Sequence, residues 1–328
     1  MRRDPVDDAT LALLLEVAGT PKPGNVDRHR DLGDLRFEAF LGGAVGAREG
    51  LEPAADEETS IGPAFERGVA GMAARAGTNT QFGCLLLLVP LVRATAETDD
   101  AGGGPSPADA DRVVRATTVD DAVAFYRAFE HVDVAVADPP ADAADLDVRR
   151  GSDAAPALRE RGATLRDVMR LSADPSAPGD PDGSGGSDDL DRVPDRNAQE
   201  WVEGFPRTFR AAEWIRSDEG PLTDRAARAF LGLLAAEPDT LVAAKHGPET
   251  AREASERAAA LLGDGGVAPD ALAGVGAIDA AAVHGADLAA AEGLATAFVD
   301  EGINPGTTAD IVCAALYVAL RRGAEVAP

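Results

Sequence analysis

The sequence has very little lysine, few aromatic residues and almost no cysteine. Only two of its 328 residues are lysine, and aromatic residues make up 4%. The two cysteines, Cys84 and Cys313, cannot form a disulfide framework, and no CxxC pair is present. Each cysteine lies in an apolar run, which is typical of a buried thiol. The composition therefore excludes a disulfide-stapled scaffold.

Long hydrophobic segments are also lacking. The longest strongly apolar run, residues 84–92, is far too short to span a bilayer. Residues 1–19 begin with two arginines, but acidic residues precede a short apolar stretch, which is not the pattern of a secretory signal. We therefore expect a cytoplasmic protein that has no membrane partner.

Charge of one sign dominates the chain. It has 57 Asp and Glu residues against 31 Lys and Arg residues, a formal net charge of −26 at pH 7. Such an excess repels nucleic-acid phosphates and anionic lipid, which argues against either as the main partner. Abundant carboxylate with almost no lysine suggests a halophilic cytoplasm, where salt screens the self-repulsion.

Apolar residues recur at helical spacing through most of the chain. Residues 7–19, for example, carry leucine and alanine at such spacing and stop at a glycine. Strand signals are poor, apart from the ambiguous residues 131–138. We predict an all-α protein with one compact multi-helix domain over residues 1–328. The other predicted helices are 34–50, 59–76, 79–95, 119–132, 197–216, 223–236, 250–262, 278–299 and 307–322.

Two acidic segments interrupt this helical pattern. Residues 96–110 and 172–195 are rich in glycine, proline, serine and aspartate, and they are nearly free of large apolar residues. Such segments cannot bury enough apolar surface to offset the entropy of ordering. We predict flexible surface insertions in both places.

Lysine, asparagine and glutamine are rare here, and most of them lie at glycine- or proline-rich helix junctions. They point to four segments as candidates for binding or catalysis: 20–31, 77–83, 239–247 and 304–310. No GxxxxGK[ST], HExxH or GxSxG motif and no paired Cys/His cluster is present. This excludes the P-loop, zinc-protease and α/β-hydrolase classes.

The first segment, residues 20–31, has two prolines around a lysine, which hold the backbone extended, while Gly24 permits a sharp turn. A stiff charged loop of this kind is suited to binding a polyphosphate or its metal ion. The alternative is a helix connection with solvated charges. The charged side chains in question are Lys22, Asp27, Arg28 and His29.

The second segment, residues 77–83, has a plain structural interpretation. Its first glycine suits a helix C-cap, and Thr78 with Gln81 would form a capping box for the next helix. A helix N-terminus is nevertheless a ready anion site, and Asn79 and Thr80 would lie there.

The last two segments allow the same two interpretations. The third opens with Asp239 and ends on a lysine–histidine pair that would complement a helix dipole. In the fourth, Thr307 and Asp310 again resemble a capping arrangement. The alternative places the amides after Gly306 against phosphate and Asp310 on Mg²⁺, which needs hard oxygen ligands.

In this order the four segments resemble the triphosphoribosyl-dephospho-CoA synthase family, the ATP:dephospho-CoA triphosphoribosyltransferases. That family's patterns are roughly TPKPGLVD, GxNTHKG, DTNxxxRxG and SPGGSADLL. The matches span most of the chain. The first is quite specific, and the other three are weak singly but strong together. The matching stretches are TPKPGNVD at 20–27, GTNTQFG at 77–83, DTLVAAKHG at 239–247 and NPGTTADIV at 304–312.

The resemblance implies an all-helical transferase that uses ATP and Mg²⁺. The family reaction joins the 2′-hydroxyl of 3′-dephospho-CoA to the ribose C1′ of ATP and releases adenine. Displacement at an anomeric carbon develops positive charge on the ribose, as in glycoside chemistry. A carboxylate would activate the hydroxyl, while cations and Mg²⁺ would hold the triphosphate.

The resemblance also implies residue roles by position. Asp27 and Asp310 would be catalytic. Metal contacts would come from Asp27, Asp239 and Asp310. Nucleotide or phosphate contacts would come from Lys22, Gly24, Arg28, Asn79, Thr80, Lys245, Gly306 and Thr307. We expect the four segments to converge on one cleft, with Lys22, Asp27 and Asp310 at partly exposed loop positions.

The chain departs from the family at several points. The His-Lys of NTHKG is Gln81-Phe82, the GAHxDM stretch after the first motif is DLGDLRF at 31–37, DTN is DTL, and the last arginine is Lys245. These changes keep the polyphosphate side and alter the acceptor side. Two alternatives therefore stay open: the same chemistry on another acceptor in cofactor biosynthesis, and a non-catalytic nucleotide-binding helical protein. The sequence leaves the acceptor and the oligomeric state undecided.

Overall fold

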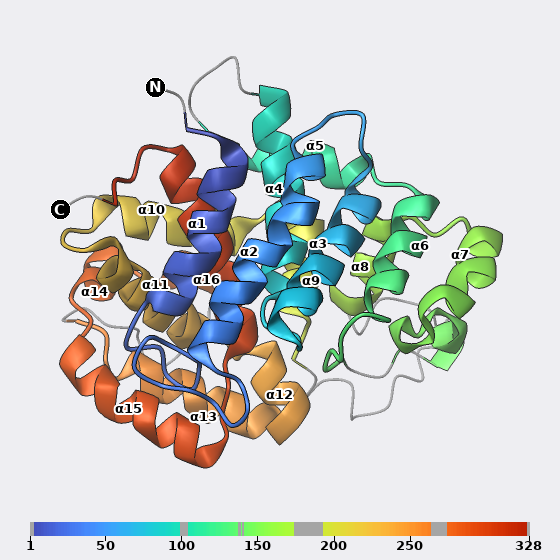
Figure 1. Cartoon of the computed structure of the whole chain (residues 1–328). Coiled ribbons are helices and arrows are strands. Elements are labelled where there is room, and N and C mark those ends of the chain that lie inside the picture. The colour runs from blue at the N-terminus through green and yellow to red at the C-terminus, as the bar shows by residue number, and fades with distance from the viewer. Residues whose placement is uncertain are drawn as a thin grey trace. The chain divides into compact units, whose positions relative to one another are not determined.

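The computed structural model describes residues 3–98, 104–136, 139, 141–173, 193–263 and 274–326. These residues are mostly helical, and no strand occurs among them (Figure 1), so the all-α prediction is confirmed. None of the helices found there is long and apolar enough to cross a membrane. Residues 99–103 of the predicted insertion 96–110 and residues 174–192 of the predicted insertion 172–195 lie outside the described residues.

The chain divides into two compact units. Unit 1 comprises residues 1–41 and 206–328, and unit 2 comprises residues 42–205. The single domain inferred from the sequence stays a prediction. Unit 1 contains α1 (Pro5–Ala18), α10 (Pro206–Ser217), α11 (Leu222–Ala236), α12 (Thr240–His246), α13 (Pro248–Ala259), α14 (Ala280–His284), α15 (Leu288–Glu301) and α16 (Gly306–Arg321).

Helix α16 forms the centre of unit 1. Each residue from Ile311 to Leu320 is at most 3% exposed, including Cys313. A helix that is apolar all round has to be covered on every side. Helices α1, α10, α11 and α12 pack against α16, and Figure 1 shows α1 beside it. The N-terminal end of α16 is therefore held on a rigid support.

Unit 2 contains most of α2 (Phe37–Ala54), followed by seven α-helices and two short 3₁₀ helices. They are α3 (Ile61–Ala76), α4 (Phe82–Thr98), α5 (Pro107–Arg115), α6 (Val119–Ala128), α7 (Ala155–Arg161), α8 (Leu165–Ala173), α9 (Arg196–Glu203), η2 (Ala141–Leu146) and η3 (Val148–Ala154). An aromatic cluster lies at its core, with neighbouring ring centroids 4.9–6.3 Å apart. Its members are Phe65, Phe82, Phe125 and Phe129.

Glycines bring α2 and α3 unusually close in unit 2. A Cβ atom at Gly46 would collide with the carbonyl oxygen of Gly71, and one at Gly50 would collide with that of Ala64. Gly42 lies opposite the carbonyl of Arg75. The two helices are thus antiparallel, and their backbones touch where glycines of α2, Gly46 and Gly50, lie against glycines of α3, Gly71 and Gly68.

The structure corrects several helix boundaries. The predicted helix 197–216 is two helices, because Gly204 and Phe205 both adopt positive φ before Pro206. The predicted helix 278–299 is likewise broken near Gly285. Three helices, α5, α7 and α8, were not predicted. The first of them starts inside the acidic range 96–110, where Ser106 and Asp109 form a capping box.

Candidate functional site

The first and fourth sequence segments lie against each other in unit 1. Gly24 has φ of 73°, and a Cβ atom there would collide with the carbonyl oxygen of Ile303. Next to it, the buried Asn25 side chain donates a hydrogen bond to the carbonyl of Pro305, at 3.2 Å. The TPKPG loop is thus fixed on the residues that lead into α16.

The third segment joins them through one buried carboxylate. One oxygen of Asp239 accepts hydrogen bonds from the amides of Leu241 and Val242, at 2.9 and 3.1 Å, and so caps α12. Its other oxygen accepts from the Thr308 amide at 2.7 Å and the Thr308 hydroxyl at 2.8 Å. Asp239 therefore caps α12 and α16 at once. Burial raises the pKa of this carboxyl above its ordinary value.

Further contacts close the same assembly. Gly306 lies against the Leu241 side chain, and the His246 ring is 3.0 Å from the carbonyl oxygen of Gly302. Three of the four segments thus converge in unit 1, as expected. The second segment belongs to unit 2, so the convergence of all four stays a prediction.

Asp27 organises the first segment from within. It is completely buried, and its carboxylate accepts four hydrogen bonds at 2.8–3.3 Å. The donors are the Thr20 hydroxyl, the Lys22 and His29 amides and the Arg30 guanidinium. Asp27 was expected at a partly exposed position, and that expectation is wrong, because the loop folds around its carboxylate.

Lys22 was also expected to be partly exposed, and it is not. Its side chain and that of Glu16 in α1 are each 3% exposed, and the Lys22 ammonium donates to the Glu16 carboxylate. Burial raises the pKa of Glu16, and the nearby Lys22 opposes that shift in part. The lysine of the TPKPG loop is therefore neutralised inside unit 1.

The predicted metal ligands do not fit a magnesium cage. Asp27 and Asp239 each already accept four hydrogen bonds from protein donors. Within the described ranges, no three His, Cys, Asp or Glu side chains are grouped to hold a metal ion. Asp310 differs from the other two because it is only half-buried, in the first turns of α16.

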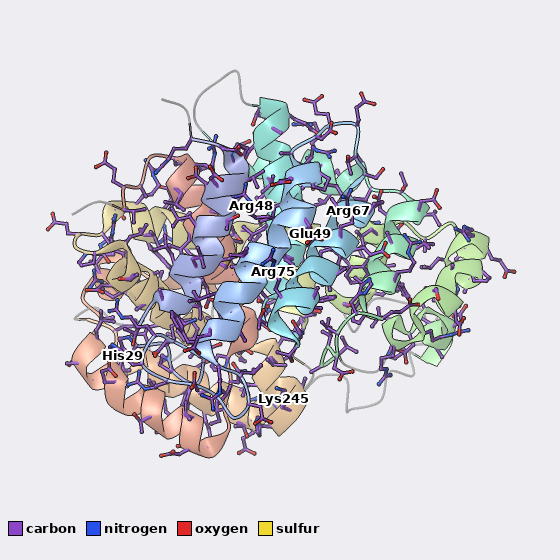
Figure 2. All side chains as sticks on the ribbon, viewed as in Figure 1. His29, Arg48, Glu49, Arg67, Arg75 and Lys245 are labelled. Atoms are coloured by element: carbon purple, nitrogen blue, oxygen red, sulfur yellow. The ribbon has the colours of Figure 1, made fainter. Side chains whose placement is uncertain are left out.

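Two basic side chains of the converging segments are exposed to solvent. Arg28 and Lys245 are exposed, and neither has an ion-pair partner in the part of the chain that the structure describes. Figure 2 marks Lys245 and His29, the neighbour of Arg28. Lys245 lies in the last turn of α12, as the sequence predicted. Gly306 and Thr307 form the first turn of α16, where the Thr307 side chain is buried.

In unit 2, the second segment mainly builds the start of α4. Gly77 ends α3 with φ of 73°, as predicted. The cap of α4 is Asn79, whose side-chain oxygen accepts from the Phe82 amide at 3.2 Å, instead of the expected Thr78–Gln81 box. The Asn79 amide group donates to the carbonyl of Asp133, and the Thr80 hydroxyl is buried.

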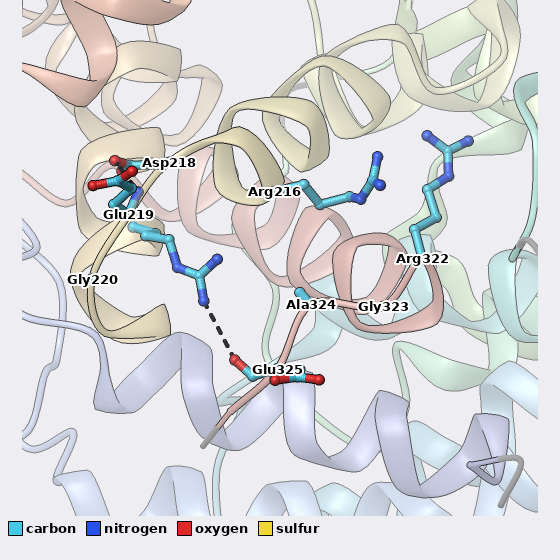
Figure 3. Close-up of a pocket in the computed structure, with 9 residues that line it drawn as sticks. Arg216, Asp218, Glu219, Gly220, Arg322, Gly323, Ala324 and Glu325 are labelled. Carbon is cyan, nitrogen blue, oxygen red and sulfur yellow. Dashed lines mark hydrogen bonds between the residues drawn. The ribbon is translucent and has the colours of Figure 1, made fainter. Parts of the chain in front are cut away.

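Unit 1 also has a pocket of about 400 Å³ at the far end of α16 (Figure 3). The 16 residues of α16 put it roughly 24 Å from the converging segments. Its three arginines are matched by three carboxylates, and Arg225 donates to the Glu325 carbonyl at 3.3 Å. This balanced charge does not favour a polyphosphate. The lining residues are Arg216, Asp218, Glu219, Gly220, Arg225, Arg322, Gly323, Ala324 and Glu325.

Replacing Gly24 by alanine should separate the first segment from Ile303. The new Cβ would collide with a backbone carbonyl at a positive φ, so we expect a loss of about 2–4 kcal/mol in urea unfolding. Gly33→Ala is the matched control, because Gly33 has φ of 57° in the same loop but nothing within 4 Å of its Cβ position. Equal losses in the two variants would contradict the close packing at Gly24.

Sequence reasoning missed two residues of this assembly. Glu16 was not singled out, although a carboxylate among the leucines of residues 7–19 is a signal of a buried partner. Thr308 gave no signal of its own, since its partner Asp239 is 69 residues away in the chain.

Comparisons with known proteins identify a family and a similar fold. A family model described as ATP:dephospho-CoA triphosphoribosyl transferase matches residues 2–176 and 191–327. None of the curated proteins matches the chain. The fold is similar to the crystal structure of a protein from Archaeoglobus fulgidus that is provisionally named triphosphoribosyl-dephospho-CoA synthase. The TM-score is 0.58 and the identity 22%, over 86% of this chain and 99% of that one.

Proposed function

The chain belongs to the ATP:dephospho-CoA triphosphoribosyl transferase family, and from that premise we propose how its residues serve the transfer. The reaction forms a bond from the acceptor 2′-oxygen to C1′ of the ATP ribose as the bond from C1′ to adenine breaks. The hydroxyl proton passes to a base, and adenine leaves with a proton. The proposal rests above all on the convergence of three motif segments around Asp239.

Arg28 and Lys245 are the cations we assign to the triphosphate. Both are exposed, come from converging segments and lack an ion-pair partner among the described residues. Lys22 does not share this role, because its ammonium is buried against Glu16. Its contribution is indirect: with Asp27 it fixes the loop from which Arg28 projects.

Asp310 is the carboxylate we assign to the proton of the 2′-hydroxyl. Asp27 and Asp239 have no capacity left to accept a proton from substrate without losing a structural hydrogen bond. Asp310 is half-buried, in the helix whose start Asp239 and Asn25 hold in place. A general base has to be within hydrogen-bond reach of its proton, which a rigid helix terminus can ensure. Magnesium stays a prediction that rests on the resemblance.

Asn79 and Thr80 stay predicted nucleotide contacts in unit 2. The altered second motif favours keeping another acceptor as a second candidate, since Gln81 and Phe82 are both buried where the family has His-Lys. A high-salt cytoplasm and the oligomeric state are also left as predictions.

Adenine release from ATP tests these assignments. Arg28→Gln and Lys245→Gln should each raise the KM for ATP about 10-fold or more, because a charge-assisted phosphate contact is lost. The KM for 3′-dephospho-CoA should stay the same. Arg252→Gln is the control, since Arg252 is an exposed arginine of α13 that has no ion-pair partner among the described residues. Unchanged KM for ATP in both variants would contradict the assignment.

A further inference from the structure

Helix α3 carries two exposed arginines for which the described residues provide no ion-pair partner. In a chain with 57 acidic and 31 basic residues, a surface arginine readily finds a carboxylate, and most described arginines have done so. Arg67 and Arg75 have not: both are exposed and neither has an ion-pair partner in the described ranges. Unpaired cations on so acidic a protein attract an anion.

The two arginines face one side of unit 2. They are eight residues apart, a rise of about 12 Å along the helix axis, and long side chains can converge over that distance. Figure 2 labels both, with Glu49 of α2 between their levels. The Glu49 Cβ lies 3.2 Å from the Cβ position of Gly71, midway between the arginines in sequence. Glu49 is exposed and forms no ion pair with either arginine.

An exposed apolar side chain adjoins these charges. Val45 is 46% exposed, one of two large hydrophobic residues found so exposed in the described chain. It lies one turn before Glu49 on the same side of α2. Gly42, three residues before Val45, lies against the Arg75 carbonyl, so Val45 lies within about one helical turn of the level of Arg75. We call Arg67, Arg75, Glu49 and Val45 the α3 patch.

We propose that the α3 patch binds the diphosphate of the 3′-dephospho-CoA acceptor, with Val45 against its pantetheine arm. This rests on the proposed function. A ligand with a diphosphate next to an apolar arm fits two arginines next to a valine. The cation that the family carries in the second motif is absent here, since Phe82 at that position packs into the aromatic core. Arg75, which precedes that motif by two residues, supplies a positive charge in its vicinity.

Calorimetric titration of 3′-dephospho-CoA and, separately, of ATP tests the proposal. We expect the double variant Arg67→Gln/Arg75→Gln to lose at least about 10-fold in affinity for 3′-dephospho-CoA and to keep its affinity for ATP. Arg252→Gln should leave both affinities unchanged. Glu49→Gln should strengthen acceptor binding, because it removes a negative charge from the patch; a merely structural role would not produce that gain.

The outcomes separate this proposal from the proposed function. If the double variant keeps its affinity for 3′-dephospho-CoA, or loses affinity for ATP instead, the α3 patch is not the acceptor site. The proposed transfer reaction is unaffected by either result. If the wild-type chain does not bind 3′-dephospho-CoA, the acceptor assignment fails. Titration with inorganic pyrophosphate then tests separately whether the two arginines bind a diphosphate. Loss of a pyrophosphate site in the double variant, but not in Arg252→Gln, would support the diphosphate site; no loss would overturn it.

Discussion

Replacing Lys22 by alanine is expected to lower the free energy of unfolding by about 3–5 kcal/mol, because it leaves the buried Glu16 carboxylate without its partner. Both side chains are only 3% exposed, so water cannot replace the ammonium. Urea unfolding of wild type and variant at pH 7 measures the loss. A loss below about 1 kcal/mol would be typical of an exposed loop lysine and would contradict the buried pair.

The pH dependence gives this prediction a second readout. Burial raises the pKa of Glu16 in the folded protein above its pKa in the unfolded chain. Protonated Glu16 therefore stabilises the folded state fully at pH values below the unfolded-state pKa. This stabilisation is lost as the pH rises through the folded-state pKa. Without Lys22 the folded pKa rises further. The deficit of Lys22→Ala should therefore shrink as pH falls toward the ordinary Glu value of 4.5.

A double variant provides the control. Lys22→Met/Glu16→Gln removes both charges at similar volume, so it should recover much of the lost stability and show no such pH-dependent deficit. If the double variant is as unstable as Lys22→Ala at every pH, then lost packing and not the unpaired carboxylate is the cause.

Replacing Asp239 by alanine is the second large expected effect. Two helix N-termini, those of α12 and α16, lose their cap together, so we expect a loss of about 2–4 kcal/mol in the free energy of unfolding. Thermal or urea unfolding without nucleotide measures it.

Asp287→Ala is the matched control, because Asp287 caps α15 alone, through the Ala290 amide at 2.9 Å. Its removal should cost about 1 kcal/mol. Equal losses in the two variants would contradict the double cap. A metal-ligand role for Asp239 would instead show as weaker ATP–Mg²⁺ binding with little change in stability.

Much of this architecture could be predicted from the sequence. The 3.6-residue spacing predicted most helices, because their apolar faces are continuous, as in α16. Rare residues at proline- and glycine-bounded junctions predicted the candidate segments, three of which the structure brings together. Lys245 was correctly placed near a helix end, since the Gly247 that follows it is a helix terminator.

The rest could not be predicted, for identifiable reasons. The exposure of a loop lysine depends on what lies beneath it, and Glu16 lies in a different element from Lys22. The caps predicted for α4 and α16 followed local spacing, whereas Asn79 and the distant Asp239 provide them. Helices α7 and α8 escaped detection because they are short and highly charged, so their apolar stripe is narrow.

The most direct test of the proposed function is to incubate the protein with ATP and 3′-dephospho-CoA and quantify adenine and the coupled product together by mass spectrometry. The account predicts adenine and triphosphoribosyl-dephospho-CoA in equal amounts, and no adenine when the acceptor is omitted. Intact ATP and acceptor after incubation with folded protein, at any salt concentration tested, would contradict it.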